Sequence, residues 1–302
     1  MSRVFLYFLK PFLFIAHCTG ATTCALATLP LEIMFEIVSF LPAKARVTVS
    51  GTCRHLQHVI RSSLLSDCAR ALAPFNLLVT YLRFMQAATG CIVGGTFVSN
   101  ILFAGTIPAP PTLDIFCPRG LATELLRFLA NCDPCALASP VAPGNRNLIR
   151  AGWCISSPKL VDRRIYVYEA VSLNPMRAIA QSPTTAHFAA WTLNGIWHGY
   201  PTATSAGIFL SSPKRLFLDT ERNKMFASSL LRFLVAKGLK FSPSWTKPHL
   251  CARHPACPST YRTSQDDGCL LIRFPSSFPV AGADDAQHHH KESVGWILGE
   301  WR

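Results

Sequence analysis

Gly94, Gly95 and Asp114 are spaced so that they could take part in phosphate and metal-ion chemistry. The glycine pair follows an apolar segment, and a glycine turn lets the backbone approach a phosphate group closely. Asp114 lies in a second apolar segment, where a carboxylate could hold a divalent cation. A site for two metal ions needs two carboxylates at alternate positions of one strand, and the alternate position here is Thr112. The pattern therefore predicts a site that lacks one of its two acids.

A second group of candidate ligands lies in the Cys-, His- and Pro-rich segment that begins after Lys247. Cys and His side chains at close spacing can bind zinc tetrahedrally. The candidates are His249, Cys251, His254, Cys257 and, further along the chain, Cys269. Their spacing is not a recognised finger pattern, and the alternative is a loop with partly buried thiols. We therefore predict no metal centre and no cofactor.

Two shorter motifs have equally plain alternatives. Cys132 and Cys135 have the Cys-x-x-Cys spacing, but they follow a predicted helix and so lie at its negative end, where a thiolate is disfavoured. The three adjacent histidines at 288–290 are expected in a solvated loop. Since no segment offers a nucleophile with its base, we predict no catalytic residue.

The elements that would position Gly94, Gly95 and Asp114 can be predicted from apolar patterning. Residues 91–103 indicate a buried strand, a glycine turn and a short helix, and residues 112–118 indicate a second strand. Further along the chain, the pattern predicts a helix at 120–129, a loop at 131–147, a strand at 164–171, candidate strands at 186–200 and 205–212, a helix at 225–237, and strand-like segments at 268–274 and 294–301. This order predicts a mixed α/β domain over residues 80–302, with an irregular C-terminal part.

The N-terminal part has a different pattern. Leu29, Ile33, Ile37 and Leu41 recur every four residues, which places them along one face of a helix that Pro42 ends. A second short helix is predicted at 43–50, and a third at 52–65 with an apolar stripe of Cys53, Leu56, Val59, Ile60 and Leu64. Three such helices bury too little surface to be stable alone, so this unit should need a partner or an attached domain.

These residues resemble an F-box. The family pattern matches at Leu29, Pro30, Glu32, Ile33, Ile37, Leu41, Pro42, Val47, Val49, Thr52, Cys53 and Arg54. The resemblance implies binding to a Skp-family adaptor of a cullin-RING ubiquitin ligase. It implies an adaptor contact made by Leu29, Pro30, Ile33, Ile37, Leu41, Pro42, Val49 and Cys53. We expect Ile33, Ile37, Leu41, Val49 and Cys53 to be partly exposed in the absence of the adaptor. The departures from the family pattern are Ala45 and Arg46.

The segment around Gly94, Gly95 and Asp114 resembles a nucleotidyltransferase core that has one of its carboxylates missing. The alternative is an ordinary strand, turn, helix and strand with a loop aspartate. The order of F-box, Gly-Gly domain and Cys-containing tail also resembles a group of proteins from mushroom-forming fungi.

Composition sets limits on these interpretations. The chain has 302 residues and a formal net charge of +13, with 29 basic and 16 acidic side chains. Because the basic excess is spread along the chain rather than gathered in a stripe, nucleic-acid binding is not favoured. The chain has twelve cysteines, and several of them lie within apolar runs, which is typical of a reduced intracellular setting. Residues 1–25 look like a secretion signal, but Lys10 and Pro11 interrupt the apolar run, so a disordered or mis-assigned start is preferred over a signal or membrane anchor.

The sequence therefore predicts an α+β chain with a leader at 1–25, an F-box at 26–66 and a mixed α/β domain at 80–302. The predicted function is recruitment of an unknown substrate protein to a ubiquitin ligase in the cytoplasm or nucleus, without chemistry of its own. One alternative is a nucleotidyltransferase-like enzyme that uses Asp114 with Gly94 and Gly95. Another is a secreted protein with paired cysteines.

Overall fold

The structure is a computed structural model, and the residues that it describes are 29–103, 106–142, 148–180, 182, 184–210, 235, 240–242, 261–266, 268–274 and 294–296. The chain divides into two compact units, residues 1–67 and residues 68–302. The first unit is helical and the second is built on a mixed sheet, which confirms the predicted α+β class.

The first unit contains α2 (Leu31–Phe40), α3 (Ala43–Ser50) and the beginning of α4 (Arg54–Leu72). Pro30 and Pro42 directly precede α2 and α3 as their N-cap residues, with extended backbone. A proline is well suited to a helix start because its missing N–H would have no intrahelical acceptor there. Helix α3 has the predicted bounds, whereas α4 continues beyond the predicted end at Leu65.

The core of the first unit is formed by one side of α4 and one side of α2. Leu56, Val59 and Ile60 from α4 are buried together with Met34 and Val38 from α2. The α4 stripe is therefore confirmed. On α2, the inward side is centred on Met34 and Val38, so the predicted stripe through Ile33 and Ile37 is turned away from the core.

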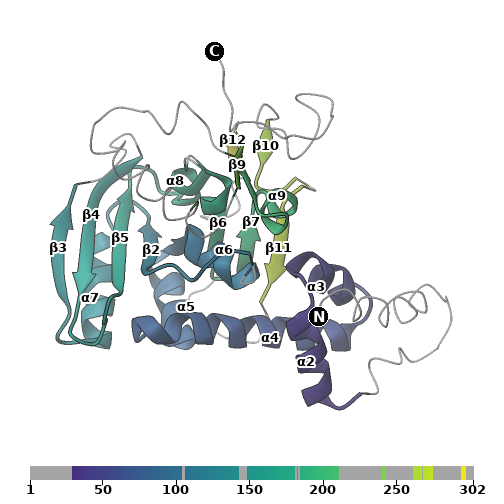
Figure 1. The fold of residues 1–302 in the computed structure, drawn as a ribbon. Helices are drawn as coiled ribbons and strands as arrows, with labels where there is room; N and C mark the ends of the chain where they lie inside the picture. Colours follow the sequence, from purple (N-terminus) through teal and green to yellow (C-terminus); the bar gives the residue numbers. More distant parts are fainter. Residues whose placement is uncertain are drawn as a thin grey trace. The chain divides into compact units, whose positions relative to one another are not determined.

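The second unit is organised around an eight-stranded sheet (Figure 1) with the order β11-β7-β6-β1-β2-β5-β4-β3. Its strands are β1 (Ile92–Gly94), β2 (Thr112–Cys117), β3 (Leu137–Val141), β4 (Ile149–Ser156), β5 (Arg164–Ala170), β6 (Ala189–Thr192), β7 (Gly195–His198) and β11 (Leu270–Arg273). Within this sheet β2 and β5 pair in parallel and every other neighbouring pair is antiparallel. The elements between the two parallel strands include helix α7 (Ala122–Cys132).

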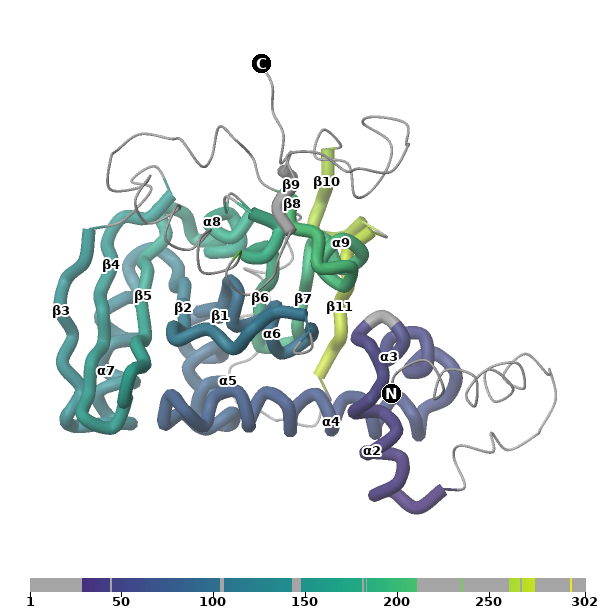
Figure 2. Tube along the Cα trace, in the orientation of Figure 1, coloured from purple at the N-terminus to yellow at the C-terminus, as the bar shows by residue number. Residues whose placement is uncertain are grey.

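The other elements of the second unit lie around this sheet, as the tube view (Figure 2) shows for α5 (Val79–Thr89), α6 (Thr96–Leu102), α8 (Met176–Ala180) and α9 (Pro201–Ser205). On the N-terminal side they are η3 (Ala73–Phe75), α5 and α6. Further along they are α8, η4 (Thr185–His187), α9, the parallel pair β8 (Ile208–Leu210) and β9 (Lys240–Ser242), and the antiparallel pair β10 (Arg262–Thr263) and β12 (Gly295–Trp296). Helices α5 and α7 contact each other, while α6 and α8 contact β6.

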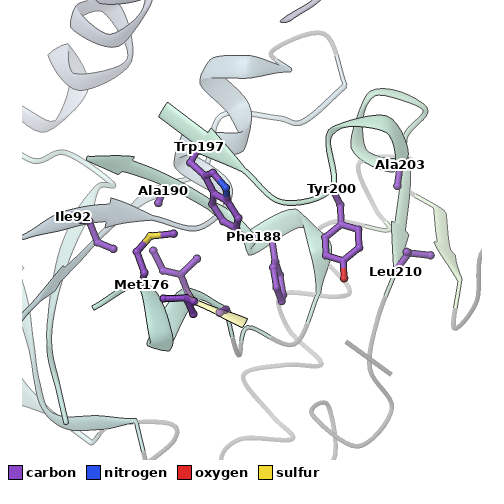
Figure 3. Close-up of a cluster of buried hydrophobic side chains, with 11 residues drawn as sticks. Ile92, Met176, Phe188, Ala190, Trp197, Tyr200, Ala203 and Leu210 are labelled. Carbon is purple, nitrogen blue, oxygen red and sulfur yellow. The ribbon is translucent and has the colours of Figure 1, made fainter. Parts of the chain in front are cut away.

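One large apolar cluster holds the middle of the sheet to the elements after β5 (Figure 3). Met176 of α8 lies beside Ala190 and Trp197 of the β6–β7 hairpin, and Phe188 and Tyr200 meet edge to face with ring centroids 5.4 Å apart. All five side chains are buried. The cluster explains why the predicted candidate segment at 186–200 forms a buried hairpin.

The predicted strands at 91–103, 112–118, 164–171, 186–200, 205–212 and 268–274 are all present, with the predicted short helix after Gly95. The prediction of a loop over 131–147 was wrong in part, because Leu137–Val141 forms edge strand β3. Edge strands tolerate proline, and Pro140 made this segment look like a loop. Strand β4 had no counterpart among the predicted elements. The predicted helix at 225–237 and the Cys- and His-containing segment at 249–258 lie outside the described residues.

Arg262 joins β10 to the turn after β7. Its Nε and Nη2 donate to the Asp266 carboxylate at 2.5 and 2.6 Å, and Nη2 also donates to the Gly199 carbonyl at 3.1 Å. The guanidinium lies over the Tyr200 ring, 5.0 Å from its centroid, and the Arg262 side chain is 2% exposed. A charge this deeply buried is tolerated because carboxylate, carbonyl and ring all face it.

Replacing Arg262 should therefore destabilise the second unit. Arg262→Gln leaves Asp266 without its bidentate partner, which should lower the free energy of unfolding by about 2–4 kcal/mol. Tryptophan fluorescence during denaturation reports on this unit alone, because all six tryptophans follow residue 67. The matched control is Arg273→Gln at an exposed position of β11, which should change stability little. Equal loss in both variants would contradict the proposed role of Arg262.

Candidate functional site

Helix α2 presents an apolar face to solvent. Ile33 is 44% exposed and Phe40 is 66% exposed, while Ile37 between them is half-buried. Positions i, i+4 and i+7 lie on one side of a helix, so the three side chains form one continuous stripe. Pro30 at the helix start is also exposed. We call Pro30, Ile33, Ile37 and Phe40 the α2 face.

The residues predicted to contact the adaptor fall into three groups. Three of them are exposed, namely Pro30, Ile33 and Pro42. Four are half-buried, namely Leu29, Ile37, Leu41 and Cys53, and of these four all but Ile37 pack against the core of the first unit. The expectation that Val49 is partly exposed was wrong, because Val49 is 7% exposed and belongs to that core. The reason is geometric: α3 is a single short helix, and its small apolar residues must supply the side that faces α2 and α4. Phe40 was missed, although its spacing from Ile33 is the signal that would have identified it.

Arg46, a departure from the family pattern, has an internal role in this unit. Its Nε donates to the Leu41 carbonyl at 3.0 Å and its Nη2 to the Ser39 carbonyl at 3.1 Å, so it caps the C-terminal end of α2. Its Nη1 pairs with the Asp67 carboxylate on α4 at 2.8 Å. The last carbonyls of a helix have no intrahelical donor, and a cation is favoured there. One side chain on α3 therefore connects all three helices.

The second candidate site is the place where β1 ends against β2. Gly94 lies opposite Asp114 in the antiparallel register, and Gly95 follows with φ +80°, in the region that favours glycine. A Cβ placed on Gly95 would lie 3.3 Å from Asp114 Oδ2 and 3.6 Å from His187 Cδ2. A Cβ on Gly94 would lie 2.7 Å from Ile179 Cδ1. The structure thus brings Gly94, Gly95 and Asp114 together, as their spacing predicted.

Among the described strand neighbours of Asp114 there is no second carboxylate, which a two-metal mechanism requires. The register partners of Asp114 are Gly94 on β1 and Tyr166 on β5, and its alternate neighbours on β2 are Thr112 and Phe116. None of these is an acid. Among the described residues, no group of three or more His, Cys, Asp or Glu side chains could hold a metal ion. The geometry therefore gives no support to nucleotidyl transfer by two metal ions.

The Asp114 carboxyl is in an unusual electrostatic state. Part of the side chain is accessible, yet burial raises its pKa to about 7. No described residue donates a hydrogen bond to it. The neighbouring His187 is neutral at pH 7, since burial lowers its pKa to about 4, and its Nδ1 lies 2.9 Å from Thr184 Oγ1. A carboxyl with a raised pKa and no internal partner is typical of a ligand site.

The other sequence candidates gain little from the structure. Burial raises the pKa of Cys132, so this thiol is not activated at its helix end. The eight described cysteines carry free thiols: Cys53, Cys68, Cys91, Cys117, Cys132, Cys135, Cys154 and Cys269. Within the described part of the chain, no helix has the length and apolar character needed to span a bilayer.

Comparison with known proteins identifies one segment. Residues 26–66 match the family described as F-box-like, so the chain carries an F-box-like domain over the three helices of the first unit. No curated protein matches the chain. The resemblances to a nucleotidyltransferase and to a fungal group find no support in these comparisons.

The Arg46 contacts predict a specific loss of stability in the first unit. Arg46→Met removes the α2 cap and leaves Asp67 without this ion pair, which should cost about 1–3 kcal/mol. Amide hydrogen exchange over residues 31–66 should become faster, while the tryptophan signal of the second unit should stay unchanged. Arg54→Met, at an exposed position of α4, is the control. Unchanged exchange in the Arg46 variant would contradict the capping role.

The raised pKa of Asp114 predicts a pH-dependent stability. The folded chain keeps this proton up to about pH 7, whereas the unfolded chain releases it near pH 4, so stability falls between these values. Above pH 7 the free energy of unfolding of Asp114→Asn should therefore exceed that of wild type by about 1–3 kcal/mol, given the partial exposure of the side chain. The difference, measured by thermal or denaturant unfolding, should vanish below about pH 4. Asp162→Asn, at an exposed position, is the control. A difference that persists at low pH would show that burial of the charge is not its cause.

Proposed function

We propose that the chain is the substrate-recruiting subunit of an SCF-type cullin-RING ubiquitin ligase and works inside the cell. The first unit binds a Skp-family adaptor, and the second unit holds the protein to be ubiquitinated. The observation that carries this proposal is the match of residues 26–66 to the F-box-like family. It is supported by the α2 face. The side chains of this apolar stripe do not belong to the core of the first unit, although the opposite side of the same helix does.

The adaptor contact in this proposal begins at Leu29 and Pro30 and follows the α2 face. Helix-in-groove binding uses apolar side chains at positions i, i+4 and i+7, which is the spacing of Ile33, Ile37 and Phe40. Leu41, Pro42 and Cys53 complete the predicted contact at its edges. Val49 contributes indirectly, since its buried side chain helps to hold α3 in place. Arg46 is engaged within the unit and orients α2 rather than reaching the adaptor.

The role proposed for the second unit is binding rather than chemistry. The two-metal requirement is not met at Asp114, and the part of the chain that the structure describes contains no other candidate metal group. Nucleotide binding at Gly94, Gly95 and Asp114 stays a prediction.

Capture by a Skp-family adaptor tests the proposal. Ile33→Ser and Phe40→Ser each remove an exposed apolar side chain without opening the core, and each should weaken adaptor binding by about 1–3 kcal/mol, or roughly five- to hundredfold. Leu29→Ala with Pro30→Ala should also weaken it. The measurement is titration of the purified full chain with the adaptor.

The matched control is Leu78→Ser, because Leu78 is 72% exposed but lies in the second unit. It should bind the adaptor as tightly as wild type. If wild type, the Leu29/Pro30 double variant and the α2-face variants were all captured equally, the proposed adaptor contact would be refuted.

A further inference from the structure

One face of strands β2 and β5 carries side chains that are partly accessible. In β2 and β5 every second residue is buried, and Asp114, Phe116, Tyr166 and Tyr168 occupy the alternate, accessible positions. Side chains at alternate positions of a strand point to the same face. The opposite face is filled by buried apolar residues such as Leu113, Ile115, Ile165 and Val167. On β2 and β5 one face is therefore apolar and buried and the other is polar–aromatic, and at Phe116 this second face meets the apolar cluster around Ile92 and Ala190.

Three aromatic rings on this face lie next to one another. Phe116 and Tyr168 have ring centroids 5.3 Å apart, and Tyr168 and Tyr166 stack nearly parallel with centroids 6.0 Å apart. Tyr166 is the direct register partner of Asp114 on the parallel neighbour strand. The row of rings thus ends beside a carboxyl group that no described residue pairs with. We call Asp114, Phe116, Tyr166 and Tyr168 the carboxyl–aromatic face.

The chemistry of this face selects for cations over anions. A carboxylate repels phosphate unless a metal ion lies between them, and the described residues provide no metal group here. Aromatic rings attract organic cations through their electron-rich faces. Arg164 lies two residues before Tyr166 on the same face and is exposed, so it borders the site rather than pairing with Asp114.

We propose that the carboxyl–aromatic face binds a lysine or arginine side chain of the polypeptide that the second unit recruits. The cationic head pairs with the Asp114 carboxylate, and the aliphatic stem lies along the rings of Tyr166 and Tyr168. Glycine at position 95 keeps its side of the carboxylate uncovered, because a Cβ there would lie 3.3 Å from Asp114 Oδ2. This inference rests on the proposed substrate-recruiting function and specifies what is recognised.

The physical reason lies in the protonation of the Asp114 carboxyl. Without a partner, the buried carboxyl stays protonated up to about pH 7 because ionisation there is costly. An arriving cation compensates the charge, so Asp114 ionises on binding and the ion pair forms in a setting shielded from water. Lys and Arg stems are long enough to cover an aromatic surface while the head group reaches a carboxylate. Binding should therefore strengthen as pH rises from 6 to 8. Of the neighbouring groups, His187 stays neutral because burial lowers its pKa to about 4, and Tyr166 and Tyr168 stay protonated because burial raises their pKa values.

The test uses the full chain and short Gly/Ser peptides that differ only in a central residue: Lys, Arg, citrulline or norleucine. Citrulline and norleucine keep the shape and stem but lack the charge. The Lys and Arg peptides should bind at least fivefold more tightly than their neutral counterparts, as measured by fluorescence anisotropy. Asp114→Asn should abolish that preference, and Tyr166→Ala should weaken it. Asp162→Asn should leave it intact, which separates the local effect from general electrostatics.

Two competing ligands complete the experiment. Spermidine that displaced the peptides at equal concentration would overturn the polypeptide assignment in favour of a free amine. Magnesium-bound ATP that bound in an Asp114-dependent manner would overturn the cation assignment in favour of a nucleotide. Absence of any Lys or Arg preference in wild type would overturn it outright.

Adaptor capture is measured on the same samples. Asp114→Asn should keep adaptor binding, and Ile33→Ser should keep the peptide preference while losing the adaptor. Because each variant affects one readout, failure of the cation site and failure of the ligase role can be told apart.

Discussion

The parallel pairing of β2 with β5 is the interaction on which the second unit depends. It sets two strands side by side with the same alternation, so that Leu113, Ile115, Ile165 and Val167 point together into the core. Complete burial of one face gives the register a strong preference, since a slip of either strand by one residue would send its two apolar side chains to the accessible face. The same register necessarily places Asp114, Phe116, Tyr166 and Tyr168 together on the other side. The carboxyl–aromatic face is thus a direct consequence of how the core is built.

The first unit has a small core, since three short helices have little surface to bury. Its core uses Met34 and Val38 from α2 against the α4 stripe, and this leaves Ile33 and Phe40 outside. Arg46 compensates by joining α2, α3 and α4 through two carbonyls and one carboxylate. The departure from the family pattern at this position therefore forms a capped and ion-paired junction. A rigid α2 is useful to a binding face, because less conformational entropy is lost when a partner binds it.

The fold could be predicted where a periodic apolar pattern decides the structure. The helices of the first unit, the strand and helix around Gly94 and Gly95, and the strands holding Asp114 and Tyr166 all have such patterns, and all are present. Strand β3 was not predictable in this way, because its residues are exposed and include Pro140, so neither alternation nor burial marks them. Which side of α2 faces inward also depended on packing: Ile33, Met34, Ile37 and Val38 are all apolar, and only contact with α4 distinguishes them.

In the candidate sites, too, some contacts could be predicted from the sequence and others depended on how distant strands pair. The approach of Gly95 to Asp114 was predictable because a glycine turn between neighbouring strands leaves few arrangements. The partnership of Asp114 with Tyr166 was not, since it depends on β5 pairing with β2 across an intervening helix and two other strands. The pairing with β5 also determines which groups surround Asp114. Beside a second carboxylate Asp114 would belong to a metal site, whereas beside two tyrosine rings it is a single negative group in an aromatic setting. Ionisation of such a group destabilises the free protein. A binding partner that brings a positive charge would offset this unfavourable free energy.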